Sequence, residues 1–311
     1  MTPFDFVPWR TTQLARVEAA LEGFIDAHSP ADLGVVMRYG VLGGGKRLRA
    51  LLVLAASDAV GGHPEAALRA ACAVEMIHAY SLIHDDMPCM DNDVLRRGKP
   101  TVHVAYGEAQ ALLAGDALQA LAFEILTPDT HATLASASSV PEALQAQLCR
   151  LLARASGSEG MAGGQAIDLA SVGKTLTEAQ LRRMHELKTG ALLQASVVMG
   201  WACGRAESQS QRSLQADHGV HFQKYGSAVG LAFQVVDDIL DVTGDAARLG
   251  KTAGKDAAAN KPTYVALMGL EAAQNYADGL LEKALKALDA CGLSQDAALR
   301  ALASELVQRH F

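Results

Sequence analysis

The sequence is poor in cysteine and in aromatic residues. Its five cysteines, among 311 residues, are scattered and odd in number, and none forms a Cys-x-x-Cys pair. This pattern argues against a zinc site or a disulfide framework and favours a reduced, cytoplasmic protein. Aromatic residues make up only 5% of the chain, so Ala and Leu supply most of its apolar surface.

Targeting signals and a basic surface are also missing. The N-terminal MTPFDFVPWR has no basic start followed by an apolar run, so we expect no signal peptide. No stretch reaches the roughly 18 uninterrupted apolar residues of a membrane span, so we expect none. The formal net charge of −7 implies no broad basic surface, which argues against nucleic acid as the main partner.

Apolar residues recur at spacings of three and four along nearly the whole chain, which predicts an all-α protein. No composition break or short repeat divides it, so we expect one domain over residues 1–311. The predicted helices cover about 11–27, 31–39, 64–86, 102–126, 177–201 and 216–241, with others ending near 60 and 155 and two more after 262. Residues 91–100, 127–141 and 204–216 are predicted loops.

Two acidic clusters interrupt apolar, helix-like segments. The first is Asp85-Asp86-Met87-Pro88-Cys89-Met90-Asp91 and the second is Asp237-Asp238-Ile239-Leu240-Asp241. Buried carboxylates are costly unless they are paired or bind a metal. A solvated helix end is the alternative, but the residues around the second cluster are too apolar for a surface. The two clusters therefore predict opposed walls of one site that holds cations.

Spacing within the clusters points to magnesium. Gln234, Asp237 or Asp238, and Asp241 share one helical stripe, where like charges repel unless a cation lies between them. His78 lies seven residues before Asp85, on the same helical face. Oxygen-only ligands in pairs suit Mg²⁺, which keeps several waters.

Basic residues accompany the acidic clusters. Lys46, Arg47 and Arg49 share one turn after a glycine run, and Arg96, Arg97 and Lys99 follow the first cluster. Bases beside metal-binding carboxylates suggest a polyphosphate substrate, although a lone lysine is more simply a solvated charge. The glycine run is not a phosphate-binding P-loop, because Lys46 is followed by Arg47. This weakens a kinase or ATPase interpretation.

Several segments, in order along the chain, resemble trans-prenyl diphosphate synthases, most closely the bacterial farnesyl diphosphate synthases. They are GGGKRLR at 43–49, IHAYSLIHDDMPCMDNDVLRRGKPT at 77–101, AGDALQALAF at 114–123, GMAGGQAIDL at 160–169, KTGALL at 188–193 and GLAFQVVDDILDVTGD at 230–245. The resemblance implies a single-domain helical bundle of the isoprenoid synthase type, with a deep central cavity, acting as a homodimer. It also implies head-to-tail condensation of isopentenyl diphosphate with an allylic diphosphate.

The same resemblance assigns roles to residues. Magnesium, about three ions held with the substrate diphosphate, would be bound by Asp85, Asp91 and Asp237, with Asp86, Asp238 and Asp241 in support. The allylic diphosphate would be held by Arg96, Lys188, Thr189, Gln234, Lys251 and Lys261. Isopentenyl diphosphate would be held by Gly45, Lys46, Arg49, His78 and Arg97. Catalysis would rest on Lys188, Thr189 and Gln234 near the allylic cation, with Asp85 and Asp237.

Product length would depend on how far an apolar tail descends below Asp85. Tyr80 lies five residues upstream, roughly 7–8 Å along a helix, and its neighbour Ser81 is too small to add a second block. An aromatic residue there, with four residues between Asp86 and Asp91, resembles the short-chain bacterial pattern. We therefore predict a C15 product, with C20 as the alternative and plain core packing as the other explanation for Tyr80.

Two other functions share some of these features. A terpene cyclase also ionises an allylic diphosphate, but it has no need for the isopentenyl site that Lys46, Arg49 and Arg97 would form. A catalytically silent partner subunit of a prenyl synthase would tend to lose an acidic motif, and both are complete here.

Overall fold

The computed structural model describes residues 4–129, 140–174, 176–204, 209–243 and 263–308, with only the helical backbone described for 209–217. The first half comprises α1 (Phe6–Phe24), η1 (Pro30–Asp32), α2 (Leu33–Val41), α3 (Leu48–Ala59), α4 (Pro64–Asp85), β1 (Leu95–Arg96), β2 (Lys99–Pro100), α5 (Val102–Tyr106) and α6 (Glu108–Glu124). The second half comprises α7 (Glu142–Ser156), α8 (Met161–Ala170), α9 (Glu178–His185), η2 (Glu186–Gly190), α10 (Ala191–Ala202), α11 (Gln209–Thr243), α14 (Tyr264–Met268), α15 (Leu270–Cys291) and α16 (Ala297–Val307). The predicted all-α class is confirmed.

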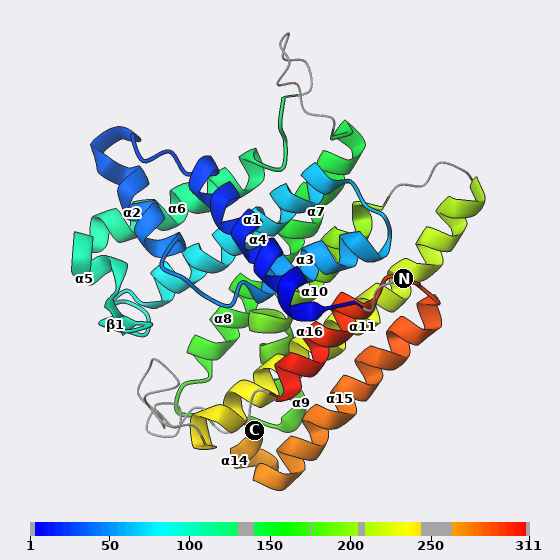
Figure 1. Cartoon of the computed structure of the whole chain (residues 1–311). Coiled ribbons are helices and arrows are strands. Elements are labelled where there is room, and N and C mark those ends of the chain that lie inside the picture. The colour runs from blue at the N-terminus through cyan, green and yellow to red at the C-terminus, as the bar shows by residue number, and fades with distance from the viewer. Residues whose placement is uncertain (1–3, 130–139, 175, 205–208, 244–262, 309–311) are drawn as a thin grey trace.

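Two hydrophobic clusters form the interior. One surrounds α4 and takes in α1, α2, α6 and α7, while the other surrounds α11 and takes in α15 and α16. Helices α3 and α10 contribute to both, Val53 and Met199 to the first and Leu52 and Val197 to the second. Figure 1 shows α3, α4 and α10 in the middle of the bundle, with α15 and α16 along one side.

Helix α4 is the described helix that is long and apolar enough, by composition, to cross a membrane. Of its most apolar window, 67% is buried inside the protein, and it carries the buried Glu75. This is the behaviour of a core helix, whose apolar surface is satisfied by its neighbours.

Local signals explain several helix ends. Pro64 opens α4 in the first turn, as predicted, and the predicted capping box at Thr177 and Gln180 opens α9. The side chain of Thr263 accepts a hydrogen bond from the backbone N–H of Ala266 at 3.1 Å and caps α14. These ends depend on contacts within one turn, which is why the sequence predicts them.

Other boundaries differ from the predictions. Gly107, at φ +88°, divides the predicted helix 102–126 into α5 and α6, because it adopts a conformation that other residues rarely take. The predicted loop at 91–100 contains the short hairpin of β1 and β2, and α11 begins at Gln209, inside the predicted loop 204–216. The predicted helix 177–201 is interrupted by η2, a single π-helical turn.

Candidate active site

The first acidic motif forms a compact turn at the end of α4. Pro88 prevents the helix from continuing, and the chain folds back so that the N–H of Asp91 donates to the carbonyl of Asp85 at 2.9 Å. Burial raises the pKa of Asp85 to about 6; Lys188 opposes this rise and Asp91 adds to it. Asp85 therefore lies in a setting where an added cation would stabilise its charged form.

Asp86 has a different environment from Asp85. It is 3% exposed at the side chain and accepts from Nε of Arg96 at 2.8 and 2.9 Å and from Nη2 at 2.5 Å. Burial alone would lower the pKa of Arg96, but the bonds to Asp86 raise it overall. Asp86 thus orients the Arg96 guanidinium that the resemblance assigns to the allylic diphosphate.

The second acidic motif lies near the end of α11. Asp238 is 3% exposed and accepts from the N–H of Tyr264 at 2.8 Å and from Nε2 of Gln234 at 2.9 Å. Asp241 is 5% exposed, and within the described part of the chain its Oδ1 has no hydrogen-bond partner. An unsatisfied buried carboxylate oxygen is the kind of atom that a metal or its bound water would satisfy.

The π-helical turn η2 packs against both α8 and α11. It places Lys188 against Asp168 of α8, Nζ to Oδ2 at 2.5 Å, and Thr189 against Gln234 of α11, Oγ1 to Oε1 at 3.2 Å. A Cβ added to Gly164 would lie 2.1 Å from the backbone nitrogen of Lys188, so only glycine allows α8 to approach this closely. Such turns are frequent at functional sites, because the extra residue redirects side chains.

Basic residues gather beside the first motif. Arg49 is 9% exposed and its Nε has no hydrogen-bond partner within the described residues. Burial lowers the pKa of Arg49, opposed by Glu75 and Asp237, while Arg97 lowers it further. Burial, with Arg49 and Arg97, holds the pKa of His78 well below its usual range, so this imidazole is neutral. These shifts indicate an anion-binding site.

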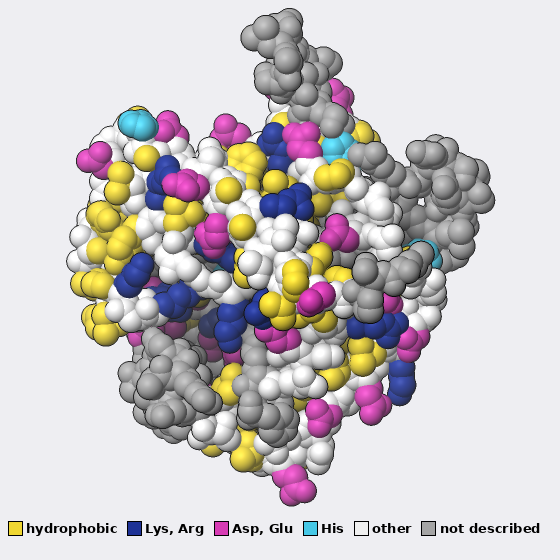
Figure 2. Space-filling view, viewed as in Figure 1, with side chains coloured by type: hydrophobic (Ala, Val, Ile, Leu, Met, Phe, Trp, Pro, Cys, Tyr) yellow, Lys and Arg dark blue, Asp and Glu magenta, His cyan; other side chains and the backbone are white. Residues whose placement is uncertain are grey.

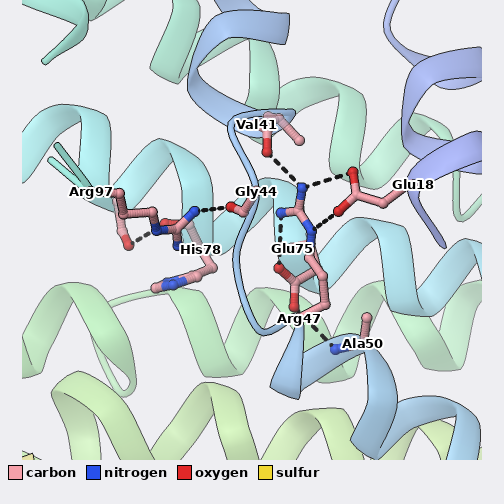
Figure 3. A network of polar contacts seen from close by, with 9 residues as sticks. Glu18, Val41, Gly44, Arg47, Ala50, Glu75, His78 and Arg97 are labelled. Carbon is pink, nitrogen blue, oxygen red and sulfur yellow. Dashed lines mark hydrogen bonds and ion pairs between the residues drawn. The ribbon is translucent and has the colours of Figure 1, made fainter. Parts of the chain in front are cut away.

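The loop 43–47, just before α3, contacts Arg97 at this site. Its guanidinium donates to the carbonyl of Gly44 and lies against Gly45, where a Cβ would be 2.9 Å from Nη1 (Figure 3). In Figure 3, Arg97 and His78 lie next to each other on one side of the loop. Figure 2 shows dark blue Lys and Arg side chains following one another across this face, from the β1–β2 hairpin toward α1.

Comparison with known proteins decides the family. The family model described as polyprenyl synthetase matches residues 31–302. The chain belongs to the polyprenyl synthetase family. It is a prenyltransferase of the trans-isoprenyl diphosphate synthase type.

Similar proteins differ in their named products. A probable farnesyl diphosphate synthase of Sinorhizobium fredii (strain NBRC 101917 / NGR234) is 49% identical, over 91% of this chain and 82% of that protein. Geranylgeranyl pyrophosphate synthase 9, chloroplastic, of Arabidopsis thaliana is 46% identical, over 99% of this chain and 82% of that protein. A crystal structure of a geranyltransferase from Helicobacter pylori, complexed with magnesium and isoprenyl diphosphate, is 34% identical with a TM-score of 0.80, covering 99% of this chain and 98% of that one.

The acidic residues of this polyprenyl synthetase fit magnesium bound together with a substrate. Within the described residues, no three Asp, Glu, His or Cys side chains converge into a closed metal cage. Mg²⁺ is usually held by one or two carboxylates together with waters and substrate phosphates. The displaced pKa of Asp85 and the unsatisfied Oδ1 of Asp241 agree with such a partly protein-built site.

The structure gives only local contacts for Tyr80 and Ser81, the residues predicted to set the product length. Tyr80 packs edge-on against His84 with ring centroids 5.7 Å apart, and burial together with Asp85 raises the pKa of its hydroxyl. Ser81 donates to the carbonyl of His78 within its own helix at 2.9 Å. Lys251 and Lys261 lie outside the described residues. A small pocket of about 50 Å³ lies beside the first motif between α2, α4 and the hairpin. The deep central cavity stays a prediction.

Two charged residues of the site were not assigned from the sequence. Asp168 lies inside the quoted segment GMAGGQAIDL, but nothing in the spacing pairs it with Lys188, 20 residues later. Glu75 of α4 accepts from the N–H of Ala50 at 3.1 Å and pairs with Arg47, so it fixes the start of α3 that carries Arg49 (Figure 3).

Proposed function

We propose that this protein condenses isopentenyl diphosphate with dimethylallyl diphosphate and then with geranyl diphosphate, giving (2E,6E)-farnesyl diphosphate. The observation that carries the proposal is that η2 acts toward both acidic motifs. The charge of Lys188 opposes the rise that burial causes in the pKa of Asp85 in the first motif, and Thr189, the next residue, is hydrogen-bonded to Gln234, which lies on α11 just before the second. The cluster of Arg49, neutral His78 and Arg97 lies beside them and suits a second diphosphate.

The cationic residues of the site would bind the diphosphates, and its carboxylates would bind Mg²⁺ or orient the cations. Arg96 and Lys188 would hold the allylic diphosphate, with Asp86 and Asp168 keeping their cationic groups in place. Mg²⁺ held by Asp85, Asp91 and Asp237 would supply the charge that stabilises the leaving diphosphate. His78, being neutral, can donate a hydrogen bond to isopentenyl diphosphate without adding charge.

The allylic C–O bond then breaks, and the alkene of isopentenyl diphosphate attacks the resulting cation. The Thr189 hydroxyl and the Gln234 side chain would lie near this cation, where their oxygen dipoles favour positive charge. One proton is lost to complete the double bond. The departing diphosphate can accept it, so the reaction needs no protein base.

A C15 product is favoured by Tyr80, which occupies the face of α4 near Asp85. The alternative is a C20 product, supported by similarity to geranylgeranyl pyrophosphate synthases. A non-catalytic partner subunit is a weaker alternative, because both acidic motifs are complete.

A homodimer in the cytoplasm completes the proposal. Large apolar side chains are exposed on α5 and α6, namely Val104, Tyr106, Leu112 and Leu113, at 38–52%. Figure 2 shows hydrophobic side chains at the edge of the molecule occupied by α5. Such a patch is typical of an interface. Light scattering after size-exclusion chromatography would give twice the chain mass of 32.6 kDa for a dimer.

The decisive experiment is incubation with Mg²⁺, dimethylallyl diphosphate and isopentenyl diphosphate, followed by separation of the dephosphorylated alcohols by chain length. We expect farnesol as the main product and none after chelation. A C20 alcohol would favour the alternative. Product from an allylic diphosphate alone would indicate a cyclase, and no turnover in any combination would contradict the proposal.

A further inference from the structure

Asp237 and Asp238 are adjacent in sequence but differ in surroundings. Asp238 is 3% exposed, whereas Asp237 is only partly buried. The negative charge of Asp237 stabilises the charged form of Arg49. Both oxygens of Asp238 accept hydrogen bonds from the protein, Oδ2 from the N–H of Tyr264 at 2.8 Å and Oδ1 from Gln234 at 2.9 Å. Asp238, the second carboxylate of the motif, therefore has protein donors for both of its oxygens.

The bond to Tyr264 has a specific structural role. Tyr264 is the first residue of α14, so its N–H has no acceptor within its own helix. The residue is fully buried, and an unsatisfied N–H there would be costly. Asp238 supplies the missing acceptor and thereby fastens the start of α14 to α11, across 26 positions of the sequence.

The bond to Gln234 continues into the reactive region. Because a carboxylate only accepts, it sets Nε2 of Gln234 toward Asp238 and Oε1 toward the hydroxyl of Thr189, at 3.2 Å. Thr189 follows Lys188 in η2, so this relay fixes the π-helical turn against α11. Removing the acceptor at 238 would release both the amide and the turn.

We propose that Asp238 is a positioning residue that acts by accepting these two hydrogen bonds, and that it does not bind magnesium. The kinetic part rests on the proposed prenyltransferase function. The structural part concerns the metal-free protein and can be tested without activity.

Three variants separate the two roles. Asp238→Asn keeps an oxygen for Tyr264, and Gln234 can turn its amide over so that its oxygen accepts from the new amide group. Asp238→Ala removes both acceptors. Asp237→Asn is the matched control, because it makes the same chemical change at the neighbouring residue assigned to the metal.

Hydrogen exchange in the metal-free protein provides the first measurement. Labelling with ¹⁵N-tyrosine gives six amide signals at most, one of them from Tyr264. We expect slow exchange at Tyr264 in the wild type, exchange about tenfold faster or more in Asp238→Ala, and exchange within about threefold of wild type in Asp238→Asn. Fast exchange of Tyr264 in the wild type would overturn the proposal.

Steady-state kinetics provides the second measurement. Asp238→Asn should keep kcat within about threefold and an unchanged half-saturating Mg²⁺ concentration, while Asp238→Ala should lose about 10- to 100-fold in kcat with little change in KM for isopentenyl diphosphate. Asp237→Asn should need more Mg²⁺. If Asp238→Asn instead matches Asp237→Asn in both kcat and Mg²⁺ requirement, Asp238 is a metal ligand.

These two measurements also separate failure of the proposed prenyltransferase function from failure of the inference about Asp238. Absence of turnover in the wild type would refute the proposed function but leave the Tyr264 measurement intact. If Asp238→Ala does not fold, the comparison of Asp238→Asn with Asp237→Asn still decides between the two roles.

Discussion

Arg47 offers the sharpest test of how the loop 43–47 is held. Its guanidinium is 4% exposed and donates to Glu18 at 2.7 and 3.2 Å, to Glu75 at 3.3 Å and to the carbonyl of Val41 at 2.7 Å (Figure 3). Burial alone would lower the pKa of Arg47, but the two carboxylates raise it above its usual value. The two acidic partners differ in one respect, because the side chain of Glu75 is 4% exposed and that of Glu18 is 40% exposed.

The same substitution at these two partners should therefore have different effects. Glu75→Gln removes the buried counter-charge of Arg47 and should lower the free energy of unfolding by about 3–5 kcal/mol, as for other broken buried pairs. Glu18→Gln removes a charge that water already screens, so we expect about 1 kcal/mol or less. The difference depends on burial and not on distance, since Glu18 makes the shorter bonds.

Urea unfolding followed by far-ultraviolet circular dichroism would measure this contrast. With a slope of about 3 kcal/mol per molar urea, the midpoint should fall by about 1–1.7 M for Glu75→Gln and by about 0.3 M or less for Glu18→Gln. In an Arg47→Met background, Glu75→Gln should cost far less, because no buried cation remains unpaired. Equal small shifts for both carboxylates in the wild-type background would refute the reasoning.

Burial of His185 holds its pKa near 4. The unfolded chain therefore binds a proton near pH 6.5 that the folded protein does not bind until about pH 4, so about 3 kcal/mol of stability should be lost as the pH falls over that range. Thermal midpoints of His185→Gln across the same range should show a weaker pH dependence. Gly164→Ala should lower the melting temperature and kcat, since its Cβ would collide with the backbone of η2, whereas Gly23→Ala, with open space at its Cβ, should stabilise α1 by about 0.5–1 kcal/mol. Tyr80→Ala should shift the product toward longer chains, and an unchanged C15 product would place the floor of the tail site elsewhere. Asp85→Asn should abolish turnover without altering the circular dichroism spectrum, and chelation of Mg²⁺ should do the same to the wild type; near-normal activity of the variant would disprove the metal assignment.

The parts of the site that the sequence predicts are those set by short-range rules. Pro88 must end α4, the residue pattern at Thr177 caps α9, and carboxylates beside buried helices need partners. Each inference uses residues within a few positions of one another. The π-helical turn escapes such rules, because Glu186–Gly190 continues an apolar pattern that reads as one unbroken helix.

Pairing across the fold is the part that sequence reasoning missed. The aspartates of each motif look equivalent in sequence. In the structure, Asp86 accepts hydrogen bonds from Arg96, and Asp238 accepts them from Tyr264 and Gln234. Which carboxylate finds a protein partner depends on segments brought together by the packing of α11 against α14 and of α4 against the hairpin. No local spacing contains that information.

Two charged residues of the site, Asp85 and Arg49, indicate the chemistry of the ligand. Burial raises the pKa of Asp85 to about 6, which disfavours its negative charge, and lowers the pKa of Arg49, which disfavours its positive charge. A cation near Asp85 and an anion near Arg49 would each stabilise the charged form of the residue beside it. Arg49 would serve isopentenyl diphosphate, whereas Mg²⁺ at Asp85 would act on the allylic diphosphate together with Arg96 and Lys188, so that ion and that diphosphate would favour each other's binding. We therefore expect Mg²⁺ and diphosphate to bind with positive coupling, measurable by calorimetric titration of each in the presence and absence of the other.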